Sequence, residues 1–175
     1  MMNRIVVLGG TGFVGHALCE QLVQAFPGVR IIVPTRKARF GLAIQSLPGV
    51  ELVAADVCNP TTLRRVLLRA DAAVNLIAIL HGNATAFERL HVAFPKELGK
   101  ACRELHLQRL VHVSALGVSA DAPSHYLRSK ALGEAALRDT AAEVLTVLRP
   151  SVIFGAKDQF MNVFERVRAN YVDKV

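Results

Sequence analysis

The amino-acid sequence predicts an α/β fold in which helices cover both faces of a parallel β-sheet. Apolar strand-like segments alternate with helix-like segments along the 175 residues, without a linker or a repeat. Hydrophobic residues make up 52% of the chain and its mean hydropathy is +0.35, as expected where central strands are buried on both faces. The chain is therefore expected to form a single domain, residues 1–175.

The expected elements follow from where the apolar periodicity changes. Strands are expected over Arg4–Leu8, Arg30–Thr35, Val50–Ala54, Ala72–Ile79, Arg109–Ser114 and Val144–Val152. Helices are expected over Phe13–Ala25, Ala38–Gln45, Pro60–Arg69, Ala84–Leu105, Ser124–Thr140 and Gln159–Ala169, with start signals at Asn59-Pro60 and Asp121–Ser124. Such alternation predicts right-handed crossovers and a doubly wound sheet, whose ligands bind at the carboxyl ends of the strands. Functional residues are therefore expected at that edge.

The first strand runs directly into a turn that contains three glycines and opens the first helix. This turn leaves unpaired backbone N–H groups and the positive end of the helix dipole aimed at one point, where a pyrophosphate fits. Gly9 permits the tight turn, Gly12 lets the backbone approach the phosphates, and Gly15 lets the helix pack close to the strand. The alternative is a turn that only closes an ordinary βα unit, and a Walker A loop is excluded because His16 follows Gly15. The predicted ligands are Gly9, Thr11, Gly12, Phe13, Val14 and Gly15.

The end of the second strand carries cations and no carboxylate. NAD sites commonly place an acid here to hold the ribose 2′-hydroxyl, whereas a 2′-phosphate requires cations. The sequence therefore favours NADP(H) over NAD(H), with Arg36 as the main phosphate ligand and Thr35 or Lys37 assisting. The alternative is that these are solvent-facing residues at the start of a helix.

Polar residues also follow the third and fourth strands. Asp56 could accept the adenine amino group, and it could equally cap the helix that begins at Pro60. Asn75 places a polar side chain in an otherwise apolar run, where packing alone rarely explains it. The residues predicted to line the cofactor here are Asp56, Val57, Leu76, Ile77 and Ala78.

The segment Tyr126-Leu-Arg-Ser-Lys130 carries the candidate chemistry. Residues four apart share one face of a helix, so the Lys130 ammonium is expected to lie near the Tyr126 phenol and to favour its ionised form. A phenol with an ordinary pKa of about 10 needs such help to act as an acid or base at neutral pH. Ser114, at the end of the fifth expected strand, is predicted to polarise a substrate carbonyl, the alternative being a turn residue before Gly117. Ser114, Tyr126 and Lys130 are thus the predicted catalytic residues.

Composition narrows the classes of partner. A net charge of +7 permits nucleic-acid binding, but the basic residues are scattered and aromatic residues make up only 6%, so no specific nucleic acid is expected. The three cysteines and six histidines show no metal-ligand spacing, and no metal is expected. No apolar run is long enough to span a bilayer and the first residues enter a strand directly, which predicts a cytoplasmic protein, or one held peripherally at the inner membrane face.

Further motifs complete the pattern, over Leu76–Leu80, Phe87–Val92, Leu110–Gly117, Tyr126–Ala131 and Leu148–Gly155. With the glycine triplet, Asp56, Asn75, Ser114 and the Tyr126/Lys130 pair, the chain resembles an extended or atypical short-chain dehydrogenase/reductase of the NAD-dependent epimerase/dehydratase superfamily. It is similar, over nearly its whole length, to the NAD(P)H-binding branch related to the 39 kDa-type accessory subunit of respiratory complex I. The resemblance implies a Rossmann-type fold.

By this resemblance, Lys130 also holds the nicotinamide ribose, and Arg149–Val152 borders the nicotinamide, which adds Pro150 and Val152 to the cofactor ligands. Bacterial members are described as NADH dehydrogenases or nucleotide-sugar epimerases, which implies an oxidoreductase with a small-molecule substrate. Eukaryotic relatives keep the nucleotide as a structural cofactor. The alternative is therefore a non-catalytic accessory or assembly subunit that binds respiratory-complex subunits.

The chain departs from the family pattern at two places. His91 stands where classical members carry an Asn that supports a proton-relay water, and a His could substitute for it. Family members continue beyond the point at which this sequence stops, Val175, so their C-terminal substrate region is expected to be truncated or absent here.

The resemblance also implies a homodimer, because helices of this family pair with their copies. The apolar stripe Phe87, Leu90, Phe94 and Leu98, however, is typical of a core.

Overall fold

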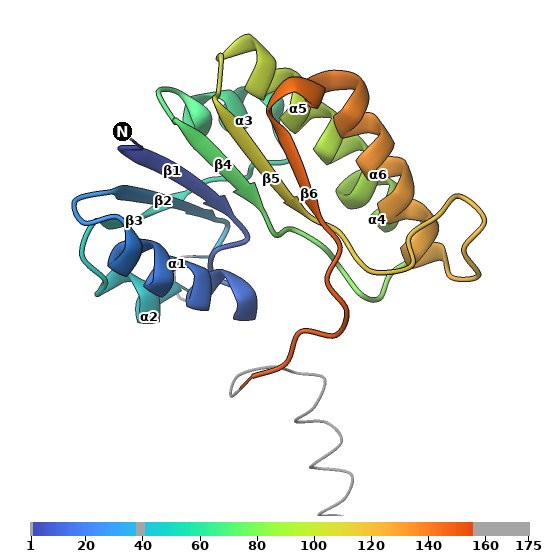
Figure 1. Ribbon diagram of the computed structural model, residues 1–175, viewed down its shortest axis with the longest axis horizontal. Helices are drawn as coiled ribbons and strands as arrows, with labels where there is room; N and C mark the ends of the chain where they lie inside the picture. Colours follow the sequence, from blue (N-terminus) through green and yellow to red (C-terminus); the bar gives the residue numbers. More distant parts are fainter. Residues whose placement is uncertain (1, 38–40, 156–175) are drawn as a thin grey trace, which may run out of the picture.

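The computed structural model of the protein describes residues 2–37 and 41–155, which form a six-stranded parallel sheet with helices on both faces (Figure 1). The strands are β1 (Arg4–Leu8), β2 (Arg30–Thr35), β3 (Val50–Ala54), β4 (Ala72–Asn75), β5 (Arg109–Val113) and β6 (Leu145–Leu148). Their order is β3-β2-β1-β4-β5-β6. The predicted doubly wound α/β fold is therefore confirmed. The expected helix Gln159–Ala169 and the start of the helix expected from Ala38 lie outside the described residues.

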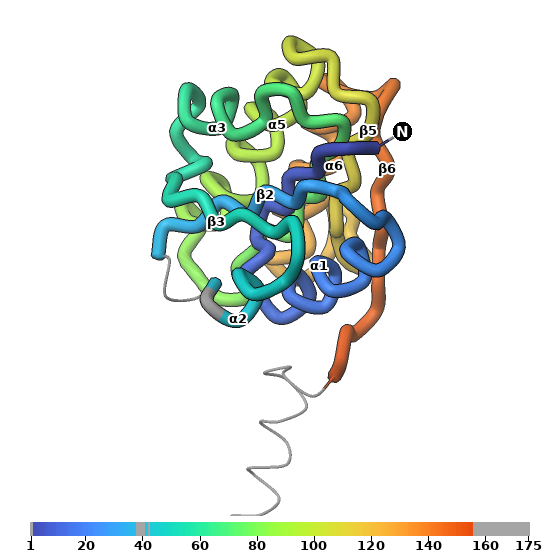
Figure 2. Tube along the Cα trace, turned by 90° about the vertical axis from the view of Figure 1, so that its left-hand side faces the viewer, coloured from blue at the N-terminus to red at the C-terminus, as the bar shows by residue number. Residues whose placement is uncertain are grey.

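Helices lie in two layers. On one face are α1 (Phe13–Ala25) and α2 (Leu42–Gln45), and on the other are α3 (Pro60–Leu67), α4 (Ala84–Phe87), the π-helix η2 (Glu88–Ala93), α5 (Phe94–Glu104) and α6 (His125–Ala141), followed by the 3₁₀ turn η3 (Ala142–Val144). Figure 2 shows α1 and α2 separated from α3 and α5 by the sheet. Alternate residues of β1 enter the two cores, because successive side chains of a strand point to opposite faces: Val6 and Leu8 join one, and Ile5 and Val7 join the other.

Strands β1 to β3 extend the sheet toward one edge, and β4 to β6 extend it toward the other. The order of the strands therefore reverses between β1 and β4, which are hydrogen-bonded neighbours. In their register Leu8 lies beside Asn75, so the carboxyl ends of both strands meet at one edge. Ligands of doubly wound sheets bind in the crevice at such a switch point. The loops that leave β1 and β4 therefore define where a ligand is expected.

Three expected strands are shorter in the structure, and the strand expected over 109–114 lacks only its last residue, ending at Val113. The strand expected over 72–79 ends at Asn75, because the Asn75 Oδ1 atom accepts a hydrogen bond from the Ile77 N–H (3.0 Å) and turns the chain out of the sheet. The strand expected over 144–152 ends at Leu148, just before Pro150, which has no N–H for the ladder.

Two expected helices also differ from those in the structure: one is shorter, and one contains a π-helical segment. The helix expected to reach Arg69 ends at Leu67, because Leu68 leaves the helical conformation with a ψ of 126° and Arg69 follows in a left-handed one with a φ of 61°. The helical run 84–104 contains η2 in its middle. Helix α6 packs directly on this π-helical segment at Gly133, where any Cβ would collide with the His91 carbonyl oxygen. Such π segments are rare and frequently accompany functional sites.

Candidate functional site

The glycine turn after β1 has the backbone that the sequence predicts. Gly9 has a φ of +85°, and the Gly12 N–H donates to the Gly9 carbonyl at 3.0 Å. A Cβ at position 15 would collide with the backbone of Gly10, so only glycine lets α1 start this close to the strand. Helices α3, α4 and α6 are capped by the residues before them, Asn59, Asn83 and Ser124, whose side chains accept from first-turn amides. Gly12, the residue before α1, offers no side-chain cap. The first-turn N–H groups of α1, at Phe13, Val14 and Gly15, are thus left for an anion.

A cleft of about 280 Å³ opens next to this turn, at the switch point of the sheet. It is lined by Gly9, Thr11, Pro34, Thr35, Arg36, Lys37, Ala55, Asp56, Val57, Cys58, Ile77, Ala78, Ile79 and Leu90. Most residues predicted from the ends of the first four strands are therefore brought together. Leu76 instead packs under the turn against Gly9, and the predicted ligands Gly12, Phe13, Val14 and Gly15 are not among the residues that line the cleft. Five of the lining residues were not predicted from the sequence: Pro34, Ala55, Cys58, Ile79 and Leu90. Four of them are adjacent in sequence to predicted residues, and Leu90 belongs to the helical stripe; the sequence holds no other signal for them.

The loop after β2, which carries Arg36 and Lys37, is stabilised by hydrogen bonds within the loop. The Thr35 side chain is buried, and its hydroxyl donates to the Lys37 carbonyl (3.2 Å) and accepts from the Lys37 N–H (3.3 Å). Thr35 therefore shapes the turn that presents its neighbours. Arg36 is exposed at the rim of the cleft and has no carboxylate partner within the described part of the chain.

The role of Asp56 as a helix cap is wrong. Asn59 caps α3, accepting from the Thr62 N–H at 3.0 Å, while the Asp56 Oδ1 accepts from the Cys58 N–H at 3.1 Å within its own loop. Asp56 is exposed and lines the cleft, in agreement with the other reading, a ligand on the adenine side.

A buried polar cluster lies on the other side of the β4 loop. Asn75 is buried and its Oδ1 accepts from Ile77, so its amide nitrogen faces His112 Nδ1 at 3.0 Å. Because that nitrogen donates, His112 accepts at Nδ1 and carries its hydrogen on Nε2. Burial lowers the pKa of His112 to about 3, with the Lys130 charge acting in the same direction. His112 is therefore a neutral side chain that fixes Asn75.

His91 joins the same loop to α6. Its Nε2 accepts from the Ile79 N–H at 3.1 Å, and its Nδ1 donates to the Ser129 hydroxyl at 2.8 Å, because that hydroxyl is itself the donor to the Tyr126 carbonyl. Burial lowers the pKa of His91 to about 4, with the Lys130 charge adding to the effect. Both ring nitrogens are thus committed to the protein, so His91 does not replace the relay Asn; it is a structural link.

The Tyr126/Lys130 pair departs from its expected electrostatics. Lys130 is buried and its Nζ donates to the Val113 carbonyl at 2.8 Å. Burial lowers the pKa of Lys130 to about 8, against the opposing influence of Glu134. Burial also raises the pKa of Tyr126, whose ring packs edge-on against His91 with centroids 5.5 Å apart. The expectation that Lys130 favours ionised Tyr126 is therefore wrong for this arrangement, in which burial favours the neutral phenol.

Glu134 organises the end of β6 and was missed in the sequence. It is buried, and Arg149 binds it through two contacts, Nε to Oε1 at 2.9 Å and Nη2 to Oε2 at 2.6 Å. Burial opposes ionisation of Glu134, but the hydrogen bonds from Arg149, the nearby Ser114 hydroxyl and the charges of Arg149 and Arg138 outweigh it and lower its pKa. Its position one helical turn after Lys130 is the signal that could have identified it.

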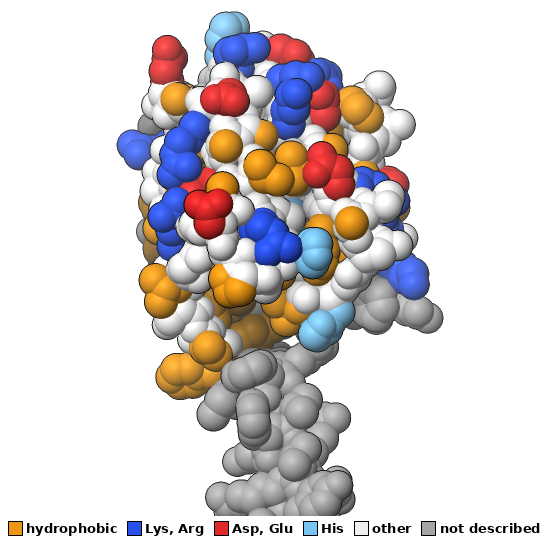
Figure 3. Space-filling view, turned by 90° about the vertical axis from the view of Figure 1, so that its right-hand side faces the viewer, with side chains coloured by type: hydrophobic (Ala, Val, Ile, Leu, Met, Phe, Trp, Pro, Cys, Tyr) orange, Lys and Arg blue, Asp and Glu red, His pale blue; other side chains and the backbone are white. Residues whose placement is uncertain are grey.

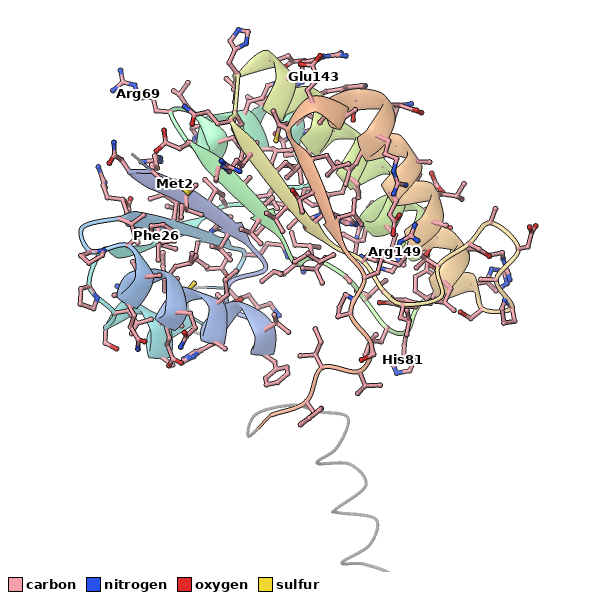
Figure 4. All side chains as sticks on the ribbon, viewed as in Figure 1. Met2, Phe26, Arg69, His81, Glu143 and Arg149 are labelled. Atoms are coloured by element: carbon pink, nitrogen blue, oxygen red, sulfur yellow. The ribbon has the colours of Figure 1, made fainter. Side chains whose placement is uncertain are left out.

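Ser114 and the segment after Arg149 meet beside this ion pair. The Ser114 side chain is buried, and its hydroxyl lies near the Glu134 carboxylate. The Leu116 N–H donates to the Pro150 carbonyl at 2.8 Å, which ties the two loops together. Figure 4 shows Arg149 where the chain leaves β6. The predicted residues Pro150 and Val152 thus follow a fixed strand end, outside the cleft.

Apolar side chains are exposed beyond Pro150. Val152, Ile153 and Phe154 are 56%, 40% and 74% exposed. Figure 3, which views the molecule from the right-hand side of Figure 1, shows apolar side chains gathered at the lower end of that face.

The helical stripe Phe87, Phe94 and Leu98 is buried, so it belongs to the core. No group of metal-binding side chains and no helix able to cross a membrane occurs among residues 2–37 and 41–155.

The comparisons with known proteins agree with this geometry. The NAD dependent epimerase/dehydratase family matches residues 5–175. The chain is 30% identical over 167 residues to NADH dehydrogenase [ubiquinone] 1 alpha subcomplex subunit 9 of Mus musculus and 28% identical over 170 residues to that of Dictyostelium discoideum. These matches cover 93% and 94% of the chain but 44% and 46% of the relatives, so the chain spans less than half their length.

Solved structures share the fold. UDP-glucuronic acid 4-epimerase from Bacillus cereus, in complex with NAD, superimposes with a TM-score of 0.80 at 19% identity, over 97% of this chain and 64% of that one. A dTDP-glucose 4,6-dehydratase from Streptomyces venezuelae, with NAD bound, gives a TM-score of 0.79 at 24% identity, over 97% and 62%.

Proposed function

Because the chain belongs to the NAD dependent epimerase/dehydratase family, we propose that it binds NADP(H) and acts as an oxidoreductase of the short-chain dehydrogenase/reductase type. Its chemistry would be NADH dehydrogenase-like, or that of a nucleotide-sugar epimerase or reductase. The observation that carries the proposal is the uncapped start of α1 at Gly12, beside a cleft whose rim presents Arg36.

The residues of the cleft fit a dinucleotide. A Cβ at position 9 would press on the Leu76 backbone at 3.1 Å, and the glycine turn leaves room for phosphates against the amides of α1. Arg36 would bind the 2′-phosphate as a charge-assisted donor, with Lys37 assisting. Asp56 would accept from the adenine, and Ile77 and Ala78 would line its apolar side.

The catalytic roles fall to the cluster across the β4 loop. Bound nicotinamide supplies hydride transfer at its C4. Tyr126 would hold the proton exchanged with the substrate oxygen, and Ser114 would orient the substrate carbonyl. Lys130 would exchange its hydrogen bond to Val113 for the nicotinamide ribose; its pKa of about 8 keeps most of it protonated at pH 7.

Parallel titration of the protein with NADPH and NADH tests the cofactor, with Arg36→Ala as the matched variant. We expect NADPH to bind more tightly and the preference to disappear in Arg36→Ala, because removal of the guanidinium leaves the 2′-phosphate without its main partner. Equal binding of both nucleotides by the wild type contradicts the NADP(H) assignment. Once a substrate is found, unchanged turnover in Tyr126→Phe contradicts the catalytic assignment.

A second function, a non-catalytic nucleotide-binding accessory subunit, is favoured by one pair of observations. The relatives reported above carry the name of an NADH dehydrogenase subunit, and Lys130 is buried and bonded to the backbone while Tyr126 is half-buried. In that function the nucleotide stabilises the fold, and the protein joins respiratory-complex subunits at the membrane. Co-purification with such subunits and absence of turnover support it; a separate cytoplasmic form with steady turnover contradicts it.

A further inference from the structure

His91 of the π-helix η2 makes hydrogen bonds on both sides of its ring. Its Nε2 atom accepts from the Ile79 N–H at 3.1 Å, and its Nδ1 atom donates to the Ser129 hydroxyl at 2.8 Å. The Ser129 hydroxyl in turn donates to the Tyr126 carbonyl at 2.8 Å. Each group therefore donates to the next one, in a single direction from Ile79 to Tyr126. Hydrogen bonds arranged in this way polarise and strengthen one another.

The first residue of this chain of hydrogen bonds belongs to the cleft, and the last does not. Ile79 lines the cleft, and so does Leu90, the residue before His91 on η2. Tyr126 is not among the described residues that line it. A ligand that fills the cleft thus contacts the loop after β4 and η2, which His91 joins, without contacting Tyr126.

The His91 ring also packs on the side chain of Tyr126. The two rings meet edge to face, with centroids 5.5 Å apart and 84° between their planes. Phe87 packs on both rings, with centroids 5.2 Å from His91 and 6.4 Å from Tyr126. Because aromatic pairs prefer a few arrangements, a displacement of the His91 ring also displaces the phenol ring.

A simpler explanation of the Ser129 hydroxyl is that serines inside helices commonly bond back to a carbonyl three or four residues earlier. That explanation covers the bond to Tyr126 and not the bond from His91, which lies 38 positions away and is buried. The backbones of the two helices also touch at this point, because a Cβ at Gly133 would collide with the His91 carbonyl oxygen. Close-packed contacts of this kind transmit small displacements from η2 to α6.

We propose that His91 and Ser129 are positioning residues for Tyr126, and that they transmit the binding of a nucleotide in the cleft to the Tyr126 phenol. This inference rests on the proposed function, and it names the residues that link the cleft to the candidate catalytic residue. A nucleotide that fills the cleft shifts the Ile79 N–H, and the His91 ring follows because both of its nitrogens are bonded. The first turn of α6, which carries Tyr126, follows the ring through Ser129.

Nuclear magnetic resonance of protein labelled with carbon-13 at the tyrosine Cζ atom tests the proposal. The sequence has two tyrosines, so Tyr171→Phe leaves Tyr126 as the only labelled residue. The probe is 5′-AMP, which has no nicotinamide and whose binding is measured separately by calorimetry. We expect saturating 5′-AMP to shift the Tyr126 signal, although the ligand lies in the cleft and does not contact this residue.

Ser129→Ala interrupts the chain of hydrogen bonds before Tyr126, whereas Ser129→Thr keeps a hydroxyl at the same place. We expect the shift at saturation to be lost in Ser129→Ala and retained in Ser129→Thr. The matched control is Ser46→Ala, because the Ser46 hydroxyl also donates to a carbonyl three residues earlier, that of Ala43, but at an exposed position. The control should leave the shift unchanged. Thermal unfolding of each variant shows whether its fold is intact.

The outcomes separate this inference from the proposed function. If 5′-AMP binds without shifting the Tyr126 signal, or if Ser129→Ala keeps the whole shift, the positioning role is wrong although the nucleotide site stands. Loss of the shift in Ser129→Thr as well as in Ser129→Ala also contradicts it, because the hydroxyl is then not the group that matters. If calorimetry detects no binding of 5′-AMP, the proposed function and the inference fail together. A shift that depends on the hydroxyl at position 129 supports the inference.

Discussion

His91 Nε2 accepts a hydrogen bond from the Ile79 N–H at 3.1 Å, so a side chain of the π-helix η2 holds the loop that leaves β4. The same loop lines the cleft through Ile77, Ala78 and Ile79. One histidine therefore couples the shape of the cleft to the helix that carries Tyr126 and Lys130.

His91→Phe should destabilise the protein by about 1–3 kcal/mol, because it keeps the ring volume but leaves the part-buried Ile79 N–H and the buried Ser129 hydroxyl without their hydrogen-bond partner. Urea unfolding followed by circular dichroism measures the change. His81→Phe is the control, since His81 is exposed in the loop before α4 (Figure 4). A His91→Phe variant as stable as the wild type would show that the link is dispensable.

Stability should decrease as the pH falls below about 6.5. Burial lowers the pKa of His91 to about 4 and that of His112 to about 3, so both are neutral in the folded state. The unfolded chain, with ordinary values near 6.5, binds more protons between these limits, and unfolding is favoured by up to about 1.4 kcal/mol per pH unit for each histidine. Urea unfolding at pH 5, 6 and 7 measures the slope, which should be shallower in His91→Phe. A slope identical to the wild type contradicts the assignment.

Glu134→Gln should destabilise the protein by about 1–3 kcal/mol, because it weakens the two-contact ion pair with Arg149 at a buried site. The matched control is Glu51→Gln, which breaks the exposed pair with Arg30 and should cost less than about 1 kcal/mol. Chemical unfolding of both variants compares them. Equal losses of unfolding free energy in the two variants would mean that burial adds no stability to the Glu134–Arg149 pair.

Gly133→Ala should destabilise the protein, although alanine is favoured over glycine inside a helix by about 1 kcal/mol. The added Cβ would meet the His91 carbonyl and force α6 away from η2. Thermal unfolding measures the sign of the effect, and nucleotide titration shows whether the cleft is disturbed with it. A higher melting temperature would disprove the close contact.

His106→Gly should stabilise the protein by about 0.5–1 kcal/mol. His106 follows α5 with a φ of 54°, and its N–H and that of Leu107 bond back to Arg103 and Cys102 in a helix-ending turn that favours glycine. His106→Ala, which keeps the left-handed strain, is the control and should give no stabilisation. The denaturant midpoints of the two variants, compared with that of the wild type, show whether glycine at position 106 stabilises the protein.

Local sequence features were sufficient for the fold and for the ends of the first three strands, whereas the fourth ends at Asn75 and not at the expected Ile79. The alternation of apolar segments, the glycines of the first turn and the start signals at Asn59 and Ser124 act over a few residues, so they can be recognised in the sequence. The residues predicted for the cleft come together because parallel strands end at one edge of the sheet.

Tertiary packing decided the electrostatics of the site. That Lys130 donates to Val113, that His91 uses both ring nitrogens and that Glu134 pairs with Arg149 depend on contacts between residues 12 or more positions apart. These contacts also fix burial, and burial sets the protonation of Tyr126, His91 and His112. The sequence by itself determined the α/β sheet and its ligand-binding edge, because periodicity and glycine conformation are local. Only the tertiary structure decided which polar groups are buried and paired there, because desolvation and hydrogen-bond partners arise from packing between distant segments.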